Sequence, residues 1–324
     1  MIAEQTLMPV ANAPAELPPA SMPLSVRIAT VLAILVPLVG VAAVPFAVWG
    51  WGFRWTDLGL LLGFYVVTTL GVTVGFHRQF VHRSFETFMW VRFILAVFGS
   101  MAVQGSLFQW VGMHRRHHQF SDTQLDPHTP HHHGEGVAGL LAGFWHAHIG
   151  WFFKPDPPDL ERYVKDLAAR PALRVASALF PLWVALGLVL PAILGGIITQ
   201  HWYGAWTGLA WGGLARVFLV HHVTWSINSA CHLWGRQPFQ SDDMSRNNVT
   251  LGILGLGEGW HNTHHAFPTS ARHGLQWWQL DISYWVIRSL AAVGLAWNLN
   301  LPSAEAQAAK RVSCGSKNSI DILP

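Results

Sequence analysis

Four long apolar stretches constrain the fold of this chain more than any other feature of its sequence. They are Ile28–Phe53, Leu58–Phe76, Val175–Gln200 and Trp202–Cys231. About 20 apolar residues are enough for a helix to cross the hydrocarbon core of a bilayer. Only 11% of the residues are charged, whereas a soluble domain carries about 25%. The sequence therefore predicts an all-α integral membrane protein with four transmembrane helices.

The positions of the positive charges predict the orientation of these helices. With four spans, only Arg54–Asp57 and the turn at Gln200–His201 lie on the far side of the membrane. Of the 20 Lys and Arg residues, Arg54 alone lies there, and Arg216 lies within a span. Positive residues concentrate in cytoplasmic loops. We therefore expect both termini and the long loops on the cytoplasmic side.

The rest of the chain divides around this membrane domain. Residues 1–26 are rich in Ala and Pro and predict a disordered N-terminal tail, while residues 301–324 predict a polar C-terminal tail. The membrane domain then spans residues 27–300. Two weaker apolar stretches, Val91–Met113 and Ile282–Leu299, carry charges or many small residues. They are predicted to be interfacial helices.

The 19 histidines outnumber the 17 Asp and Glu residues, and eight of them form three clusters. Residues at i, i+3 and i+4 share one helix face, so each HxxHH motif projects three imidazoles from one helix. The HxxxxH pair suits a helix end where the backbone can turn. An even number of spans separates the clusters, which places all of them in one cytoplasmic cap. They are His77 and His82, then His114, His117 and His118, then His261, His264 and His265.

These clusters predict a site for two metal ions. Neutral imidazole is the commonest protein ligand for Fe, Zn and Cu, and eight imidazoles are too many for one ion. Two isolated cysteines, Cys231 and Cys314, exclude zinc-ribbon and rubredoxin sites. A net charge of +3 is too small to indicate nucleic-acid binding. A histidine-rich metal transporter is an alternative, although transporters place their ligands near the bilayer midplane.

Four segments carry a resemblance to a known family. They are Gly71–Arg78, His114–His128, Trp225–Gly235 and Gly257–Pro268. In these segments the chain resembles the membrane fatty acid desaturase superfamily, and most closely the acyl-CoA (stearoyl-CoA type) Δ9 desaturases. The resemblance implies O2-dependent desaturation of a long-chain acyl group to a cis alkene. A membrane hydroxylase of the same superfamily remains an alternative.

The resemblance also implies the ligands of a di-iron centre. It adds His232 as a ninth histidine and Asn228 as an amide that contacts a metal through water. The division of the ligands between the two irons stays open at this point. The implied set is His77, His82, His114, His117, His118, Asn228, His232, His261, His264 and His265.

Further roles follow from the same resemblance. Gln104, Trp110 and Thr224 match positions that bend the acyl chain, and Tyr65 is expected near the closed end of the substrate tunnel, where it limits chain length. Metal-bound histidines usually donate their outer N–H to a carboxylate. The carboxylates beside the clusters, which we expect to accept these bonds, are Glu258, Asp122 and Asp126.

The partners of the reaction are less constrained. Fatty acyl-CoA is the expected substrate, but Gly112 stands where a phosphate-binding basic residue is expected, and Lys154 is the one lysine near a second such place. Acyl carrier protein or a phospholipid therefore remain alternatives. The chain has no electron-transfer module, which predicts a separate donor: ferredoxin, rubredoxin, or a cytochrome b5-type protein with its reductase. A missing haem domain suggests a bacterial enzyme in the cell membrane.

Overall fold

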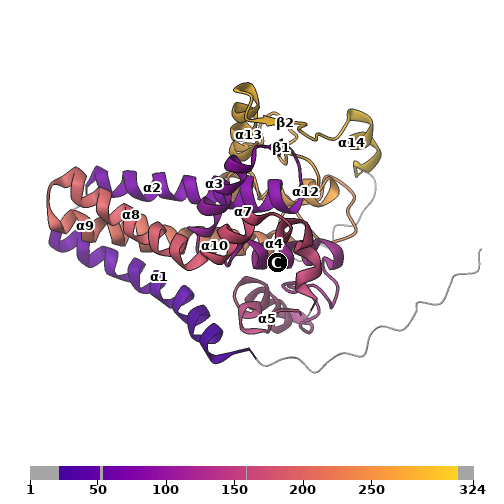
Figure 1. The fold of residues 1–324 in the computed structure, drawn as a ribbon. Coiled ribbons are helices and arrows are strands. Elements are labelled where there is room, and N and C mark those ends of the chain that lie inside the picture. Colours follow the sequence, from indigo (N-terminus) through magenta and orange to yellow (C-terminus); the bar gives the residue numbers. More distant parts are fainter. Residues whose placement is uncertain (1–21, 52–53, 158, 313–324) are drawn as a thin grey trace, which may run out of the picture.

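The computed structural model describes residues 22–51, 54–157 and 159–312. Long helices lie side by side in one part of the molecule, and shorter helices gather at one end of them (Figure 1). The short helices there carry most of the histidine clusters. The long helical segments are α1 (Leu24–Trp51), α2 (Trp55–Leu70), η1 (Gly71–Val81), α8 (Phe180–Thr199), α9 (Trp202–Gly208), η4 (Leu209–Ala215) and α10 (Arg216–Ser229).

Three helical stretches are long and apolar enough to cross a membrane: Leu24–Pro45, Trp55–Val81 and Phe180–Thr199. They correspond to three of the four predicted spans. The fourth, Trp202–Cys231, is helical without a break from α9 through η4 to the end of α10 at Ser229. It is not among the three stretches that are both long and apolar enough to cross a membrane. The structure thus supports three spans by length and composition, and the fourth stays a prediction.

Small residues let the long helices approach closely, as they commonly do in membrane proteins. A methyl group on Gly195 of α8 would lie 2.1 Å from the carbonyl oxygen of Gly204 in α9. A methyl group on Gly40 of α1 would lie 2.3 Å from Cβ of Leu214 in η4. Both distances are shorter than van der Waals contact, so α8, α9, α1 and η4 pack with glycine at the interfaces.

The two stretches predicted as interfacial helices are each interrupted. Residues 91–113 belong to α3 (Met89–Ser100) and α4 (Leu107–Phe120). The turn between them contains Val103 and Gly105 with φ of 60° and 103°. Residues 282–299 form α13 (Ile282–Ala292) and then strand β2 (Ala296–Trp297), which pairs antiparallel with β1 (Glu86–Thr87). Neither stretch is one continuous helix, because residues with left-handed backbone, Gly294 in the second case, end the helix early.

Both predicted tails have an ordered part. α1 begins at Leu24, inside the predicted N-terminal tail, while residues 1–21 lie outside the described residues. Residues 301–312 are bound to the body through backbone hydrogen bonds from Gln240 N to Lys310 O at 2.7 Å and from Val312 N to Pro238 O at 3.0 Å. The remaining elements are α5 (Gly136–His148), η2 (Gly150–Phe153), η3 (Leu160–Val164), α6 (Lys165–Ala168), α7 (Pro171–Ala178), η5 (Ala230–His232), α11 (Val249–Leu254), α12 (His261–Ala266) and α14 (Ala304–Lys310).

Candidate metal centre

The first histidine pair lies at the end of a π-helix. η1 is a π-helix from Gly71 to Val81, and the hydrogen bond from His82 N to His77 O at 3.1 Å continues its i→i+5 pattern. Such a helix brings residues five apart to the same face. The two imidazole ring centroids are accordingly 4.8 Å apart. The pair therefore lies at a helix end, as its spacing suggested, and the π-helical turn brings the two rings together.

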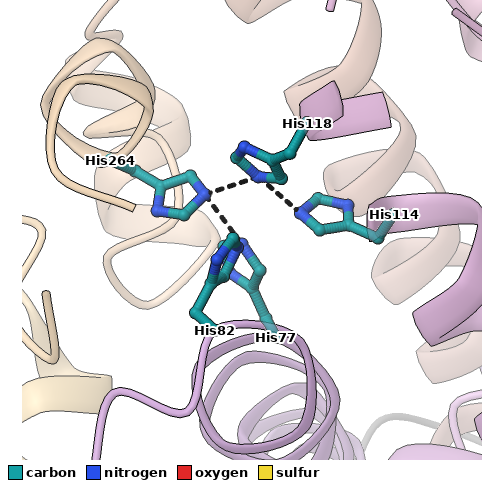
Figure 2. Close-up of side chains that lie close together, drawn as sticks. All are labelled: His77, His82, His114, His118 and His264. Atoms are coloured by element: carbon teal, nitrogen blue, oxygen red, sulfur yellow. Dashed lines mark hydrogen bonds between the residues drawn. The ribbon is translucent and has the colours of Figure 1, made fainter. Parts of the chain in front are cut away.

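The nine clustered histidines divide into two groups. In each group the candidate ligand atoms lie within 4.8 Å of one another. Figure 2 shows the five rings of the first group pointing toward one another from η1, α4 and α12. The five-histidine group is His77, His82, His114, His118 and His264, and the four-histidine group is His117, His232, His261 and His265.

The spacing between ring nitrogens fits a bound cation. In the five-histidine group, Nε2 of His264 lies 3.0 Å from Nε2 of His77 and 2.9 Å from Nε2 of His118. In the four-histidine group, Nε2 of His232 lies 3.0 Å from Nε2 of His261. Two nitrogens at about 2.1 Å from one ion and at right angles to each other are about 3 Å apart. The donor sets of both groups thus suit a transition-metal ion.

Carboxylates fix the outer nitrogens of four of these histidines. Nδ1 of His117 donates to Asp126 at 3.0 Å, Nδ1 of His232 to Asp122 at 2.8 Å, and Nδ1 of His265 to Asp243 at 2.5 Å. Nδ1 of His77 likewise contacts Glu258. A carboxylate can only accept, so each Nδ1 carries the hydrogen and each Nε2 keeps its lone pair for a metal. Glu258, Asp122 and Asp126 therefore lie where the sequence analysis expected them.

Burial changes the pKa of the side chains at the site. It lowers the pKa of five histidines well below the ordinary value, so that these imidazoles are neutral and able to bind a metal. Burial alone would raise the pKa of Asp122, but the interaction with His232 outweighs it and lowers that pKa to about 2. The five histidines are His82, His114, His118, His261 and His264.

A cavity of about 940 Å³, mostly apolar, reaches both histidine groups. Its wall includes His77 and His114 from the first group, His261 from the second, and Asn228. The first half of α1 forms another part of its wall, together with residues of α4, α8 and α10. The cavity therefore gives an apolar chain access to the metal centre.

Three of the predicted substrate residues line this cavity. Nε2 of Gln104 donates to Oγ1 of Thr224 at 2.9 Å. The ring of Trp110 stacks on that of His114, with centroids 4.9 Å apart and an angle of 14° between the planes. Tyr65 is not among the lining residues; its hydroxyl donates to the carbonyl of Leu254 at 2.6 Å. Tyr65 packs against the cluster of Val72, Ala102 and Val220, of which Val72 lines the cavity. Its role in limiting chain length stays a prediction.

Residues 54–298 match the fatty acid desaturase family. The chain belongs to this family. It is 41% identical over 281 residues to the Hex-5-enoyl-[acyl-carrier protein] acetylenase of Moorena producens, a match that covers 86% of this chain and 88% of that protein.

Two further relatives of the desaturase act on other acyl carriers, as their names state. It is 41% identical over 262 residues to the sn-1 stearoyl-lipid 9-desaturase of Synechocystis, covering 80% of this chain and 76% of that protein. It is 38% identical over 293 residues to the Icosanoyl-CoA 5-desaturase of Limnanthes douglasii, covering 89% of this chain and 75% of that protein. These matches identify a fatty acyl desaturase and leave no support for the transporter alternative.

Three residues that contact the histidine groups or their carboxylates were missed in the sequence. Asp243 lies in the loop between η5 and α11 and contacts His265. Arg78 follows His77 directly and contacts Glu258 and Asp281. His273 is fully buried, and its ring centroid is 4.5 Å from that of His264. No spacing rule points to Asp243 or His273. Arg78 directly follows the predicted ligand His77, and this position could have indicated that it lies near the site.

Proposed function

We propose that this chain is an O2-dependent desaturase that holds two iron ions, one in each histidine group, and introduces a cis double bond at the Δ9 position of a long-chain acyl group. The observation that carries the proposal is the apolar cavity that runs to both groups. All-nitrogen ligation by neutral imidazoles suits iron. Asn228 also lines this cavity, and we assign it the role of an amide that contacts a metal through water.

Iron bound at these histidines would supply the oxidation by O2 of an unactivated C–H bond. The chain's own residues hold the acyl group and exclude water. Trp110 and the pair Gln104–Thr224 line the cavity beside the histidines, so an acyl chain there passes within reach of the metal centre. Fixing one methylene pair at this place gives regioselectivity, because reacting atoms must be held within about 3.5 Å.

Three kinds of carrier could present the acyl group to this enzyme. Acyl-CoA is the carrier that the motif resemblance favours. Two observations indicate that this chain binds the phosphates of CoA more weakly. Lys154 is the one Lys or Arg among the described residues that line the cavity. A methyl group on Gly112, where a basic residue was expected, would lie 2.9 Å from the side chain of Leu160. Named relatives act on an acyl-(acyl-carrier protein), an acyl lipid and an acyl-CoA. All three carriers therefore belong in one assay.

The same proposal includes the membrane arrangement and the electron donor. Four spans, with the fourth running from Trp202 to Cys231, would put the metal centre and both termini in the cytoplasm, because nearly all Lys and Arg residues then lie on that side. A soluble cytoplasmic donor, such as ferredoxin, rubredoxin or a cytochrome b5-type protein, can deliver electrons there. The setting that fits is a bacterial cell membrane.

The test is expression in a host that lacks its own desaturase, with fatty acids identified by mass spectrometry. We expect a cis Δ9 alkene from the parent and none from His264→Ala. The matched control is His201→Ala, because His201 caps α9 at the opposite end of the long helices. An alkene from His264→Ala at the parent level would refute the metal assignment.

A hydroxy fatty acid in place of the alkene would identify the hydroxylase alternative. Purified enzyme with reduced donor should then be given one labelled acyl chain as acyl-CoA, as acyl carrier protein thioester and as phospholipid. The carrier that yields product identifies the substrate. O2 consumption without product would contradict the assignment of the cavity as the acyl site.

A further inference from the structure

A buried polar cluster lies directly behind the five-histidine group. We call its members Arg78, Glu258, His273 and Asp281 the Arg78 cluster. Nη1 of Arg78 donates to Oδ1 of Asp281 at 2.8 Å, and Nη2 donates to Oε1 of Glu258 at 3.2 Å. All four side chains are buried, and nothing in the reaction described so far uses His273.

The contacts of Arg78 determine which nitrogen of His273 carries hydrogen. Nη2 of Arg78 lies 3.1 Å from Nδ1 of His273. A guanidinium group has only donors, so Nδ1 of His273 accepts this bond and the hydrogen sits on Nε2. His273 thus presents one fixed acceptor to Nη2 of Arg78, and the only other acceptor of that nitrogen in the described hydrogen bonds is Glu258.

The loop that carries His273 is itself fixed. Oδ2 of Asp281 accepts from the backbone N–H of His273 at 2.7 Å and of Gly274 at 3.1 Å. Oδ1 of the same carboxylate caps α13 by accepting from Tyr284 N at 2.9 Å. His273 is therefore held in place independently of the histidine groups, which is a requirement for a residue that positions another.

The cluster ends on two members of the five-histidine group. The second oxygen of Glu258 contacts Nδ1 of His77. The ring of His273 lies 4.5 Å from that of His264, centroid to centroid, and 5.4 Å from that of His77. The carboxylates that contact the four-histidine group are different ones, Asp122, Asp126 and Asp243. The Arg78 cluster thus supports one group and not the other.

We propose that His273 is a positioning residue for the metal ion of the five-histidine group, acting through Arg78 and Glu258 on His77. The proposal rests on the proposed function, since it requires a metal in each group. By holding Nη2 of Arg78, His273 keeps Glu258 aimed at Nδ1 of His77. Loss of a direct outer partner such as Glu258 weakens metal binding by about 10- to 100-fold, and we expect loss of His273, which acts through it, to fall at the lower end of this range.

The experiment measures iron bound per purified full-length protein during titration with a chelator, with thermal stability recorded in parallel. His273→Leu removes the acceptor and fills the space. His273→Asn is the rescue variant, because its Oδ1 stands close to the place of Nδ1. We expect two ions in the parent, one of them released at about 10-fold lower chelator concentration in His273→Leu, and near-parental retention in His273→Asn.

Asp243→Asn supplies the comparison for the other group. It should loosen one ion, and the double variant with His273→Leu should loosen both, because the two changes act on different ions. If His273→Leu does not fold, His273→Gln replaces it; its amide lies one bond farther out, and we expect weaker retention than in His273→Asn.

Two results would overturn the inference while leaving the proposed function intact. One is parental affinity for both ions in His273→Leu or its replacement. The other is that both His273→Leu and His273→Asn lose the two ions equally, and that thermal stability falls by a matching amount in each variant. A parent that binds fewer than two ions would instead refute the proposed function, and this inference with it.

Discussion

Replacing Asp243 by Asn tests whether outer carboxylates hold the four-histidine group. Oδ2 of Asp243 accepts from Nδ1 of His265 at 2.5 Å, and Oδ1 accepts from Oγ of Ser245 at 2.5 Å and from Oγ of Ser241 at 3.0 Å. Burial alone would raise the pKa of Asp243, but the hydrogen bonds from His265 and Ser245 outweigh it and hold that pKa well below its usual range. The carboxylate is therefore charged when it holds His265.

The size of the effect follows from these contacts. Asn keeps the volume and one acceptor, so the serine bonds can survive, but it removes the negative charge that faces His265. Loss of an outer carboxylate weakens metal binding by about 10- to 100-fold, which corresponds to about 1.4–2.7 kcal/mol. We expect one of two ions to weaken by this amount and the other to keep its affinity.

The assay is the chelator titration of purified enzyme, with Asp242→Asn as the matched control because Asp242 is the exposed neighbour in sequence. The control should bind both ions as the parent does. If Asp243→Asn also binds both ions with parental affinity, the carboxylate does not support the site and the reasoning from its contacts is wrong.

Three further substitutions test other parts of the structure. Gly257→Ala should lower the free energy of unfolding by more than about 1 kcal/mol, because Gly257 has φ of 118° and a methyl group would lie 2.4 Å from Oδ1 of Asp281; thermal unfolding measures this. Thr224→Val should leave iron content unchanged but scatter the double-bond position, because Gln104 loses its acceptor at 2.9 Å; product analysis measures it. Asp166→Asn should lower the unfolding midpoint at neutral pH and not at pH about 2.

The pH dependence of the last variant follows from the sign of the pKa shift. Burial alone would raise the pKa of Asp166, but hydrogen bonds from Arg115 and Arg83 outweigh it and lower that pKa to about 2. A lowered folded-state pKa adds stability above the unfolded value of about 3.9 and loses it as the pH falls through about 2. A difference between parent and Asp166→Asn that persists unchanged at pH 2 would contradict this ion pair.

Gly63→Ala serves as the control for Gly257→Ala. Gly63 lies within α2, and a methyl group there meets nothing within 4 Å. We expect unchanged or slightly higher stability, because Ala restricts the unfolded chain more than Gly does. Double-bond position that stays as sharp in Thr224→Val as in the parent would show that the Gln104–Thr224 bond does not fix the acyl chain.

The sequence was sufficient to predict the histidines that meet, but not how they divide. Membership of the clusters follows from the HxxHH and HxxxxH spacing and from apolar stretches that bring all three to one end. The spacing of His77 and His82 indicated a helix end, and the pair lies at the end of η1. The spacing did not indicate that η1 is a π-helix. At the start of η1, Gly71 lies so close to α3 that a methyl group would be 2.2 Å from Gly99 N.

Residues in irregular loops were harder to predict than residues in helices. Glu258, Asp122 and Asp126 were found because each stands next to a histidine cluster in the sequence. Asp243 and His273 reach the centre through loops whose path depends on long-range contacts, such as the bonds from Met244 N to Oδ2 of Asp122 and from Ala271 N to Asn300 O, both at 2.8 Å. The part that α1 plays in the cavity wall could not be predicted either, because the motif resemblance does not cover α1.

Each HxxHH motif contributes histidines to both groups, and the two motifs do so in opposite ways. In α4 the i and i+4 histidines, His114 and His118, belong to the five-histidine group and the i+3 histidine to the other. In α12 the i and i+4 histidines belong to the four-histidine group, and the i+3 histidine, His264, to the first. A shift of either helix therefore disturbs both groups at once, and ligand substitutions in α4 or α12 cannot separate the ions cleanly. The outer partners can, because Asp243 serves one group and the Arg78 cluster serves the other.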